Sequence, residues 1–276
     1  MTSLELIVFN VGQGMSVALI ERPENYITLV DLGARTGFTP LKHLRLKYKL
    51  IPDVVYITHP HADHITDVET ALDANFAPYG IFYQTYDWSD VKRREKPELA
   101  YKVDLFQKLT NAVPFKQYAG HASLTPWCFT PGDARKRFGE NRYVNNSSLF
   151  IVYQWRDFKI SIAGDLESDA MSDLVGARDV QSSAVATDIL IPPHHGHKNG
   201  FPTDWVSKMG RPHVSIISVQ ERDQSVDSRY RSSDFAKGVR FGEQARYALT
   251  TRADGSVKVL MGYGDRNQAT WTFSEV

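Results

Sequence analysis

Four residues of metal-binding type stand within six positions of this sequence. They are His59, His61, Asp63 and His64, in the run His-Pro-His-Ala-Asp-His. Imidazole nitrogens suit zinc and iron, and a carboxylate can bind or bridge hard and borderline metals. A single histidine is more often solvated or packed in a core. Four such residues together, directly after an apolar run, favour a metal site instead.

The spacing of this run predicts how its side chains divide between metal ions. In an extended segment, residues two apart point the same way, so His59 and His61 can reach one cation together. Asp63 and His64 follow where the chain turns into a helix, and they can reach a neighbouring cation. Two metal ions about 3.5–4 Å apart can clamp a reacting centre and lower the pKa of a water molecule. The chemistry indicated is hydrolysis.

Two later elements supply what a two-metal site still lacks. Residues 161–165 form an apolar strand that ends in Gly-Asp, which makes Asp165 a candidate bridging carboxylate. Taken alone, a Gly-Asp after a strand is more often a turn. His194 and His195 follow another apolar run, and either ring could be the ligand. The three elements in this order are more specific than any one of them.

Both histidine clusters follow short apolar runs, residues 53–58 (DVVYIT) and 188–193 (DILIPP), which predict buried strands. Loops at strand ends in layered α/β folds are common places for functional sites. Strands are expected at residues 4–11, 16–21, 26–31, 53–58, 79–85, 148–155, 159–163, 188–191, 214–219, 247–251 and 257–261. Helices are expected at residues 39–48, 65–72, 98–111, 167–174 and 234–247, with an exposed charged insertion at 88–97. This alternation predicts one α/β domain over residues 1–276, a four-layer αββα sandwich.

The composition excludes some classes of protein. The 276 residues include 32 Lys+Arg and 32 Asp+Glu, so no global basic field attracts nucleic acid or membrane, although a local basic patch remains compatible. The one cysteine, Cys128, allows no intrachain disulfide and fits a reducing compartment. The first residues lack a basic leader, and no run approaches the roughly 18 apolar residues of a membrane helix. We therefore expect a cytoplasmic chain without a membrane partner.

The motifs, in this order, resemble those of the metallo-β-lactamase superfamily. The His-x-His-x-Asp-His run is specific for the superfamily. Residues 11–14 (Val-Gly-Gln-Gly) and 194–196 (His-His-Gly) are similar to the hydrolase domain of ComEC-type DNA-uptake proteins, here in a stand-alone form. The likeness covers nearly the whole chain. Its other matching segments are residues 30–33, 58–64, 145–149, 164–165, 215–219 and 250–257.

The resemblance implies a centre of two divalent metal ions, with zinc expected and manganese as the alternative. Within it, the first two histidines would hold one metal, and Asp63 and His64 the other. Asp165 would bridge the two. One histidine of the 194–195 pair would complete the site, with His194 preferred. The implied metal ligands are His59, His61, Asp63, His64, Asp165 and His194.

The resemblance also implies residues that act around these ligands. Asp63 and His195 are the residues expected to take part in catalysis, with His195 as a proton donor or as a support for the ligands. Asp31 resembles the aspartate that braces the histidine loop, and such carboxylates fix the tautomer of an imidazole ligand. Asn146 is expected in the same supporting layer.

The sequence departs from the family pattern at three places. Many members take a third histidine for the first metal from mid-chain, where this sequence has residues 145–147 (Asn-Asn-Ser). His121 is the remaining candidate for that position. Asn10 stands where the first turn of the subgroup carries aspartate. Residues 220–233 replace an expected Asn-x-Tyr-Gly-His-Pro segment, which weakens the inference about substrate more than the inference about chemistry.

A phosphodiester in nucleic acid or a nucleotide is the first hypothesis for the substrate, because the resemblance implies a nuclease. Arg229, Arg231 and Lys237 would contact phosphate if their loop overhangs the site; an exposed, solvated loop explains them equally well. Hydrolysis of a lactam, lactone or thioester is the rival, since a fold does not determine a substrate. A non-catalytic nucleic-acid or partner-binding relative is disfavoured by the intact ligand set. No protein partner is predicted.

Overall fold

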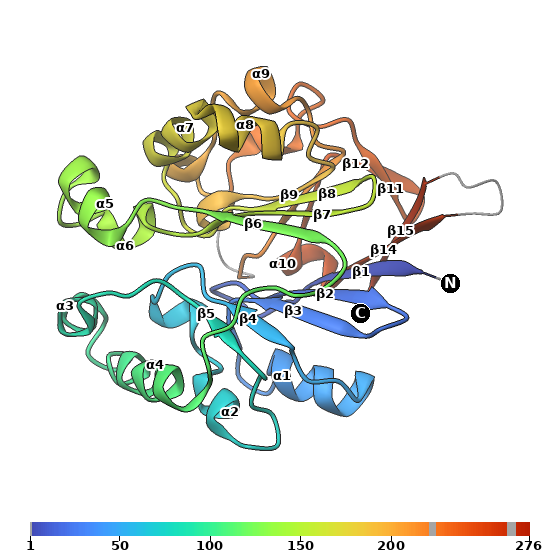
Figure 1. Ribbon diagram of the computed structural model, residues 1–276. Helices are drawn as coiled ribbons and strands as arrows, with labels where there is room; N and C mark the ends of the chain where they lie inside the picture. The colour runs from blue at the N-terminus through green and yellow to red at the C-terminus, as the bar shows by residue number, and fades with distance from the viewer. Residues whose placement is uncertain (1, 221–224, 264–268) are drawn as a thin grey trace.

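The chain forms two large β-sheets that pack face to face, with helices on both outer faces (Figure 1). The computed structural model describes residues 2–220, 225–263 and 269–276. The layers follow the order helix, sheet, sheet, helix (Figure 1). The predicted four-layer αββα sandwich of the α/β class is therefore confirmed.

The first sheet has the strand order β15-β14-β1-β2-β3-β4-β5 among the described residues. Pairing is antiparallel from β15 to β3 and parallel from β3 through β4 to β5. Parallel neighbours place their carboxyl ends, and the loops that follow, at one edge of the sheet. The strands are β1 (Ser3–Val8), β2 (Val17–Arg22), β3 (Tyr26–Val30), β4 (Val54–Tyr56), β5 (Ile81–Phe82), β14 (Val257–Tyr263) and β15 (Ala269–Glu275).

The second sheet has the order β13-β10-β9-β8-β7-β6. Strands β8, β9, β10 and β13 run parallel, and β6 and β7 are antiparallel to their neighbours. Its strands are β6 (Ser123–Trp127), β7 (Phe150–Trp155), β8 (Phe158–Ile162), β9 (Ile189–Ile191), β10 (Val214–Ile217) and β13 (Ala248–Thr250). A separate hairpin consists of β11 (Val239–Phe241) and β12 (Gln244–Arg246).

The main core lies between the two sheets. On β1, Leu4 and Leu6 are fully buried and belong to the same apolar cluster as Ile151 and Ile160 of the second sheet. Ile7, one position along, belongs to the cluster on the outer faces. Since side chains alternate across a strand, the two faces of β1 pack against different clusters, and both are covered.

Helices cover the outer faces of the two sheets. Helices α1 to α4 lie against the first sheet, and α7 to α9 lie against the second (Figure 1). None of the helices in the described ranges combines the length and apolar character needed to cross a bilayer. The helices are α1 (Pro40–His43), α2 (Val68–Leu72), α3 (Trp88–Arg94), α4 (Tyr101–Ala112), α5 (Pro131–Phe138), α6 (Tyr143–Asn146), α7 (Ser168–Gly176), α8 (Arg178–Ala184), α9 (Trp205–Met209) and α10 (Thr251–Asp254).

The structure corrects the predicted helix at residues 234–247. This segment contains the β11–β12 hairpin, with Phe241 paired to Gln244 across the turn. Gly242 in that turn has a φ of +57°. This left-handed conformation suits a two-residue hairpin turn and is incompatible with a continuous right-handed helix. The prediction of a helix over this segment was therefore wrong.

Further elements differ from expectation, among them helices α5, α8 and α9, which were not predicted. Residues 88–97 were predicted to be an exposed insertion, but α3 forms there and buries Val91. Strands β6 and β15 were not predicted. Both lie at sheet edges, where one side has no neighbour, so their sequences mix polar and apolar residues; β6 even contains Pro126, which an edge strand tolerates.

Candidate metal centre

The candidate ligands lie where three strands end. The loop that carries the first histidine cluster follows β4 of the first sheet, whereas Asp165 follows β8 and His195 follows β9 of the second sheet. Two backbone hydrogen bonds hold these loops together. Leu149 N donates to Thr58 O at 3.0 Å, and His194 N donates to Gly164 O at 2.9 Å. The site therefore lies between the two sheets at their common edge.

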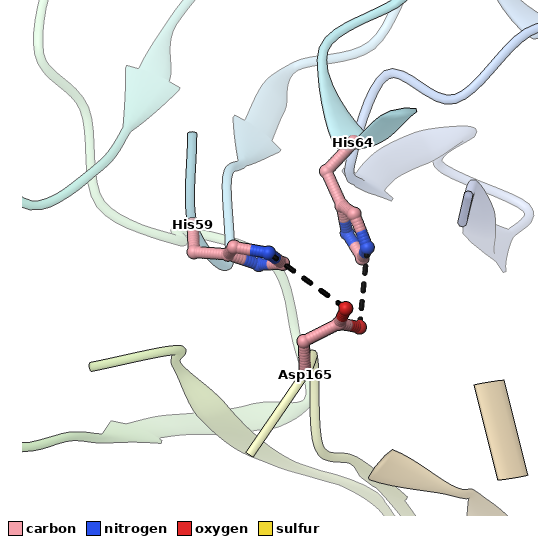
Figure 2. Close-up of side chains that lie close together, drawn as sticks. All are labelled: His59, His64 and Asp165. Carbon is pink, nitrogen blue, oxygen red and sulfur yellow. Dashed lines mark ion pairs between the residues drawn. The ribbon is translucent and has the colours of Figure 1, made fainter. Parts of the chain in front are cut away.

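Asp165 stands between two sets of histidines. Its Oδ2 lies 3.9 Å from His59 Nε2, and its Oδ1 lies 3.2 Å from His64 Nε2; Figure 2 shows both rings turned toward this carboxylate. The ligand-type atoms of these three buried residues all lie within 4.8 Å of one another. A carboxylate that presents one oxygen to each side has the geometry of a bridging ligand.

A second group consists of Asp63, His64 and His195. His195 Nε2 lies 3.7 Å from Asp63 Oδ2 and 3.5 Å from Asp165 Oδ1. It also lies 3.3 Å from His64 Nε2. His61 joins the site from the other side, with its Nδ1 3.0 Å from His59 Nε2. Five of the predicted ligands are therefore brought together: His59, His61, Asp63, His64 and Asp165.

Hydrogen bonds at the backs of the rings determine which nitrogen faces the centre. His64 Nδ1 lies 2.7 Å from Asp31 Oδ2, and His195 Nδ1 lies 3.2 Å from Ser218 O. These acceptors require a proton on each Nδ1 and direct each Nε2 toward the centre. His59 Nδ1 lies 3.2 Å from the Thr58 hydroxyl, which itself donates to Asp31. The Nε2 atoms of His59, His64 and His195 therefore all face the centre.

This arrangement fits a bound cation. His64 Nε2 and His195 Nε2 lie 3.3 Å apart, and both lie within 3.5 Å of Asp165 Oδ1. Asp165 Oδ1 is buried and makes no hydrogen bond within the described chain. A divalent cation held by these three atoms would satisfy the buried oxygen and both nitrogens. Nitrogen and carboxylate donors of this kind suit zinc or another divalent transition metal.

The electrostatics of the site point the same way. Burial opposes charge on His64, but Asp165 and Asp31 outweigh it and raise the pKa of His64 well above its usual value. Burial likewise opposes charge on Asp165, but His195 and His64 hold its pKa well below the usual range. A site that stabilises positive charge this strongly also favours a divalent cation.

The two residues predicted to support the ligands, Asp31 and Asn146, make different contacts. Asp31 follows β3, beside β4, and its carboxylate accepts from the Thr58 backbone at 2.7 Å as well as from His64. Asn146 has a different contact. Its Oδ1 accepts from Glu167 N at 2.8 Å, so it holds the turn after Asp165 and does not touch a histidine.

In the neighbouring pair, His195 lies nearer to Asp63 and His64 than His194, the ring preferred in the sequence. His195 is the ring within reach of Asp63 and His64, whereas His194 Nε2 has one carboxylate contact, 4.0 Å from Asp165 Oδ2. Both residues have left-handed φ angles, +50° and +52°, which turn adjacent rings in unusual directions. No simple pattern of residue types encodes that choice.

Other predicted residues are not brought to the ligands. His121 is exposed beside Glu24, near the β2–β3 turn. Lys237 N donates to Pro212 O, ahead of β10, whereas Ser218 contacts His195 beyond the other end of that strand.

Among the remaining predicted phosphate contacts, Arg229 is paired with Asp227 and lies 3.7 Å over the Phe201 ring. Arg231 is exposed at the end of the same short turn. Of the replaced segment at 220–233, residues 221–224 lie outside the described residues.

Sequence reasoning missed two residues that hold the loops. Glu95 Oε1 accepts from Ala62 N at 3.0 Å, within the histidine run. Ser218 holds His195 through its carbonyl, and its hydroxyl donates to Gly14 O at 2.7 Å. A signal existed for Ser218, because it ends a predicted apolar strand at the same edge of the sheet.

The close packing of Gly14 explains why the Val-Gly-Gln-Gly turn ends in glycine. A Cβ placed on this residue would lie 2.1 Å from the carbonyl oxygen of Asp63. Only glycine therefore lets this turn pack directly on the metal-binding loop while it also accepts from Ser218.

Comparison with known proteins gave structural likenesses alone. No protein-family model and no curated protein matches this chain. The metallo-β-lactamase fold protein YhfI from Bacillus subtilis aligns with 70% of this chain and 71% of its own, at 16% identity and a TM-score of 0.42. A diphosphatase of the PhnP family aligns with 90% of this chain and 94% of its own, at 12% identity and a TM-score of 0.44.

A mutant of the CmlA β-hydroxylase aligns with 80% of this chain and 46% of its own, at 12% identity and a TM-score of 0.48. At these identities and TM-scores, nothing about the reaction of this chain follows from the likenesses.

Proposed function

We propose that this chain is a metal-dependent hydrolase with a centre for two divalent cations, and that it cleaves a phosphodiester in nucleic acid or a nucleotide. The observation that carries the proposal is the convergence of three imidazole Nε2 atoms on Asp165, whose two oxygens face different histidines. Such a carboxylate suits two cations better than one.

We assign one cation to His59, His61 and Asp165 Oδ2. His194 reaches the same oxygen and takes the position of the missing mid-chain histidine. The second cation is assigned to Asp63, His64, His195 and Asp165 Oδ1. Zinc is the expected metal, with manganese as the alternative.

Bound divalent metals supply polarisation of the scissile group and a lowered pKa for an attacking water molecule. The contribution of the chain is to fix the ligands. Asp31 keeps the proton of His64 on Nδ1, and Ser218 keeps that of His195 on Nδ1, so both Nε2 atoms stay available. The buried position of these rings excludes bulk water, which strengthens each electrostatic contact.

The phosphodiester is supported by two arguments. The order of the motifs resembles that of ComEC-type hydrolase domains. In addition, the large cavity beside the site carries basic side chains, among them Lys42 and Lys96. A lactam, lactone or thioester would not need them, although the same centre is able to cleave such bonds.

The test combines metal content with activity. The purified chain, loaded with zinc or manganese, is expected to hold about two equivalents and to cleave single-stranded DNA, RNA or bis(p-nitrophenyl) phosphate. His195→Ala is expected to weaken metal binding by at least about 100-fold, since loss of an outer partner alone costs about 10–100-fold. His121→Ala, which removes a histidine away from the site, is the matched control.

Two results would contradict the proposal. One is a wild-type chain that binds no metal; the other is a His195→Ala variant with the metal content and activity of His121→Ala. Cleavage of a lactam or thioester, with no phosphodiester cleaved, would keep the metal centre and replace the substrate.

A further inference from the structure

A cavity of about 1160 Å³ opens beside the candidate centre. His61 and Asp63 line it on the side of the metal-binding loop, and Gly12 and Gln13 of the glycine-rich turn line it as well. Small-molecule sites usually measure about 300–1000 Å³. The cavity is therefore large enough for a substrate that extends beyond the bond to be cleaved.

The acidic side chains of this cavity, apart from Asp63, are occupied by the protein itself. Glu69 forms an ion pair with Lys102, and Glu95 accepts from Ala62 N. Asp67 is buried and accepts from Leu41 N. Of these three, only Glu69 is balanced by a cation; Glu95 and Asp67 accept from neutral backbone N–H groups.

Its basic side chains divide into two classes. Arg94 is held by Asp90 and Glu140, and Lys102 is held by Glu69. Three further cations also line the cavity, and none of them lies within ion-pair distance of a carboxylate among residues 2–220, 225–263 and 269–276. These are Arg35, Lys42 and Lys96.

The three cations come from separate segments around the cavity. Lys42 lies in the last turn of α1, and Lys96 follows α3. Arg35 is positioned by two contacts, a bond from its Nε to Asn10 O at 2.9 Å and a cation–π contact with Phe38. Its terminal guanidinium nitrogens remain for a ligand, and a guanidinium matches a phosphate in a bidentate manner.

We propose that Arg35, Lys42 and Lys96 form an anion subsite that takes a second phosphate group of the substrate, next to the phosphoryl group that is cleaved. This inference rests on the proposed function. Once the ion pairs are set aside, the three cations outnumber the two remaining carboxylates, Asp67 and Glu95, so the cavity beyond the centre keeps a net positive charge. A substrate with several phosphates matches it, and a neutral lactam does not. An oligonucleotide and a nucleoside polyphosphate share this chemistry.

Binding is measured apart from cleavage, on the wild-type chain in excess chelator. The probe is a fluorescently labelled single-stranded oligonucleotide, followed by anisotropy over a range of salt concentrations. Lys42→Ala and Lys96→Ala are each expected to weaken binding about 3–10-fold and to reduce the slope of log K against log salt by about 0.7. Lys42→Arg, which keeps the charge, is expected to bind nearly as the wild type. Lys237→Ala is the matched control, since it removes an exposed lysine at the far end of β10.

Cleavage provides the second measurement, with the metal-loaded chain. For both alanine variants, kcat/KM on the oligonucleotide is expected to fall at least about threefold more than kcat/KM on bis(p-nitrophenyl) phosphate, which has no second phosphate. Competition of adenosine triphosphate against the labelled oligonucleotide distinguishes the sources of the phosphate. If adenosine triphosphate competes as well as unlabelled oligonucleotide, the ligand of the subsite is a small nucleotide. If it competes weakly, the ligand is a nucleic-acid strand.

The two proposals fail in different ways. If Lys42→Ala and Lys96→Ala bind the oligonucleotide as tightly as Lys237→Ala, and with the same salt slope, the subsite is wrong, whatever the chain hydrolyses. If these variants lose binding while no preparation cleaves a phosphodiester, the subsite stands and the proposed activity fails.

Discussion

The orientation of individual rings determines the chemistry of this centre. His64 and His195 each offer one nitrogen to a fixed acceptor, the carboxylate of Asp31 and the carbonyl of Ser218. Both acceptors lie on the far side of the ring from the site. A histidine held in this way has one tautomer and one direction, which reduces the entropy lost when a metal binds.

Asp67, three positions beyond the last histidine, has a different role. Its side chain is almost fully buried, and burial raises the pKa of its carboxyl group from 3.8 to about 6. The folded protein therefore holds this proton more tightly than the unfolded chain does. The stability that results is fully present below pH 3.8 and is lost as the pH rises through about 6.

We expect Asp67→Asn to stabilise the fold at alkaline pH. Asparagine carries no charge to bury, keeps an acceptor for Leu41 N, and can donate to Thr70. The full difference between pKa values of 3.8 and about 6 corresponds to roughly 3 kcal/mol. Part of it is already lost at pH 5. The stability of the variant relative to the wild type is therefore expected to rise by about 1–2 kcal/mol between pH 5 and pH 8.

Urea unfolding in chelator at both pH values measures this difference. Asp179→Asn, which removes an exposed carboxylate on α8, is the control and is expected to show the same difference at pH 5 and pH 8. If Asp67→Asn also shows no change with pH, the buried carboxyl does not titrate as described.

At the scale of elements, the glycine-rich turn locks the metal-binding loop in place. We expect Gly14→Ala to destabilise the fold by at least about 2 kcal/mol and to weaken zinc binding, because its φ is +101° and its Cβ would overlap the Asp63 carbonyl. Gly37→Ala is the control that introduces backbone strain without a steric overlap. Its φ is +79°, but no atom lies within 4 Å of the added carbon, so it should cost about 1–2 kcal/mol and leave zinc affinity unchanged.

Unfolding midpoints and a competition titration with a chromophoric chelator provide the two readouts. A Gly14→Ala variant with the zinc affinity of Gly37→Ala would show that the turn does not position Asp63.

The elements that hold the site could be predicted because their patterns are local. The run DVVYIT predicts a buried strand, and β4 does end just before His59. The order of the layers followed from alternating strands and helices. The β11–β12 hairpin could not be predicted in this way, because its strands are only three residues long and the turn depends on a glycine conformation.

The missed contacts of the site have a common physical cause. Glu95 approaches Ala62 from α3, 33 positions away, and Ser218 approaches His195 across 23 positions. Long-range packing brings both residues to the site, and the periodicity of the sequence does not predict such packing. The choice between His194 and His195 depends on two left-handed φ angles, which the residue types alone do not specify.

At the scale of the whole molecule, the candidate centre joins the two sheets. The histidine run belongs to the first sheet, and Asp165 and His195 belong to the second. An apolar core already holds the sheets together, with Leu6 and Ile160 in one buried cluster. Metal removal should therefore weaken the fold without abolishing it. It leaves the buried carboxylate of Asp165 balanced by the neighbouring histidines alone.

We expect chelation to lower the unfolding temperature reversibly. Zinc at 100 times its dissociation constant stabilises the folded state by about 2.7 kcal/mol per site, which corresponds to roughly 5–10 °C for a domain of this size. Calorimetry of the chelated chain, followed by addition of zinc, measures the loss and its recovery. His61→Ala is expected to recover less than His121→Ala, because only the former lacks a ligand. If both variants and the wild type melt at one temperature with and without zinc, no metal links the sheets, since a cation that bound the folded state alone would have to stabilise it.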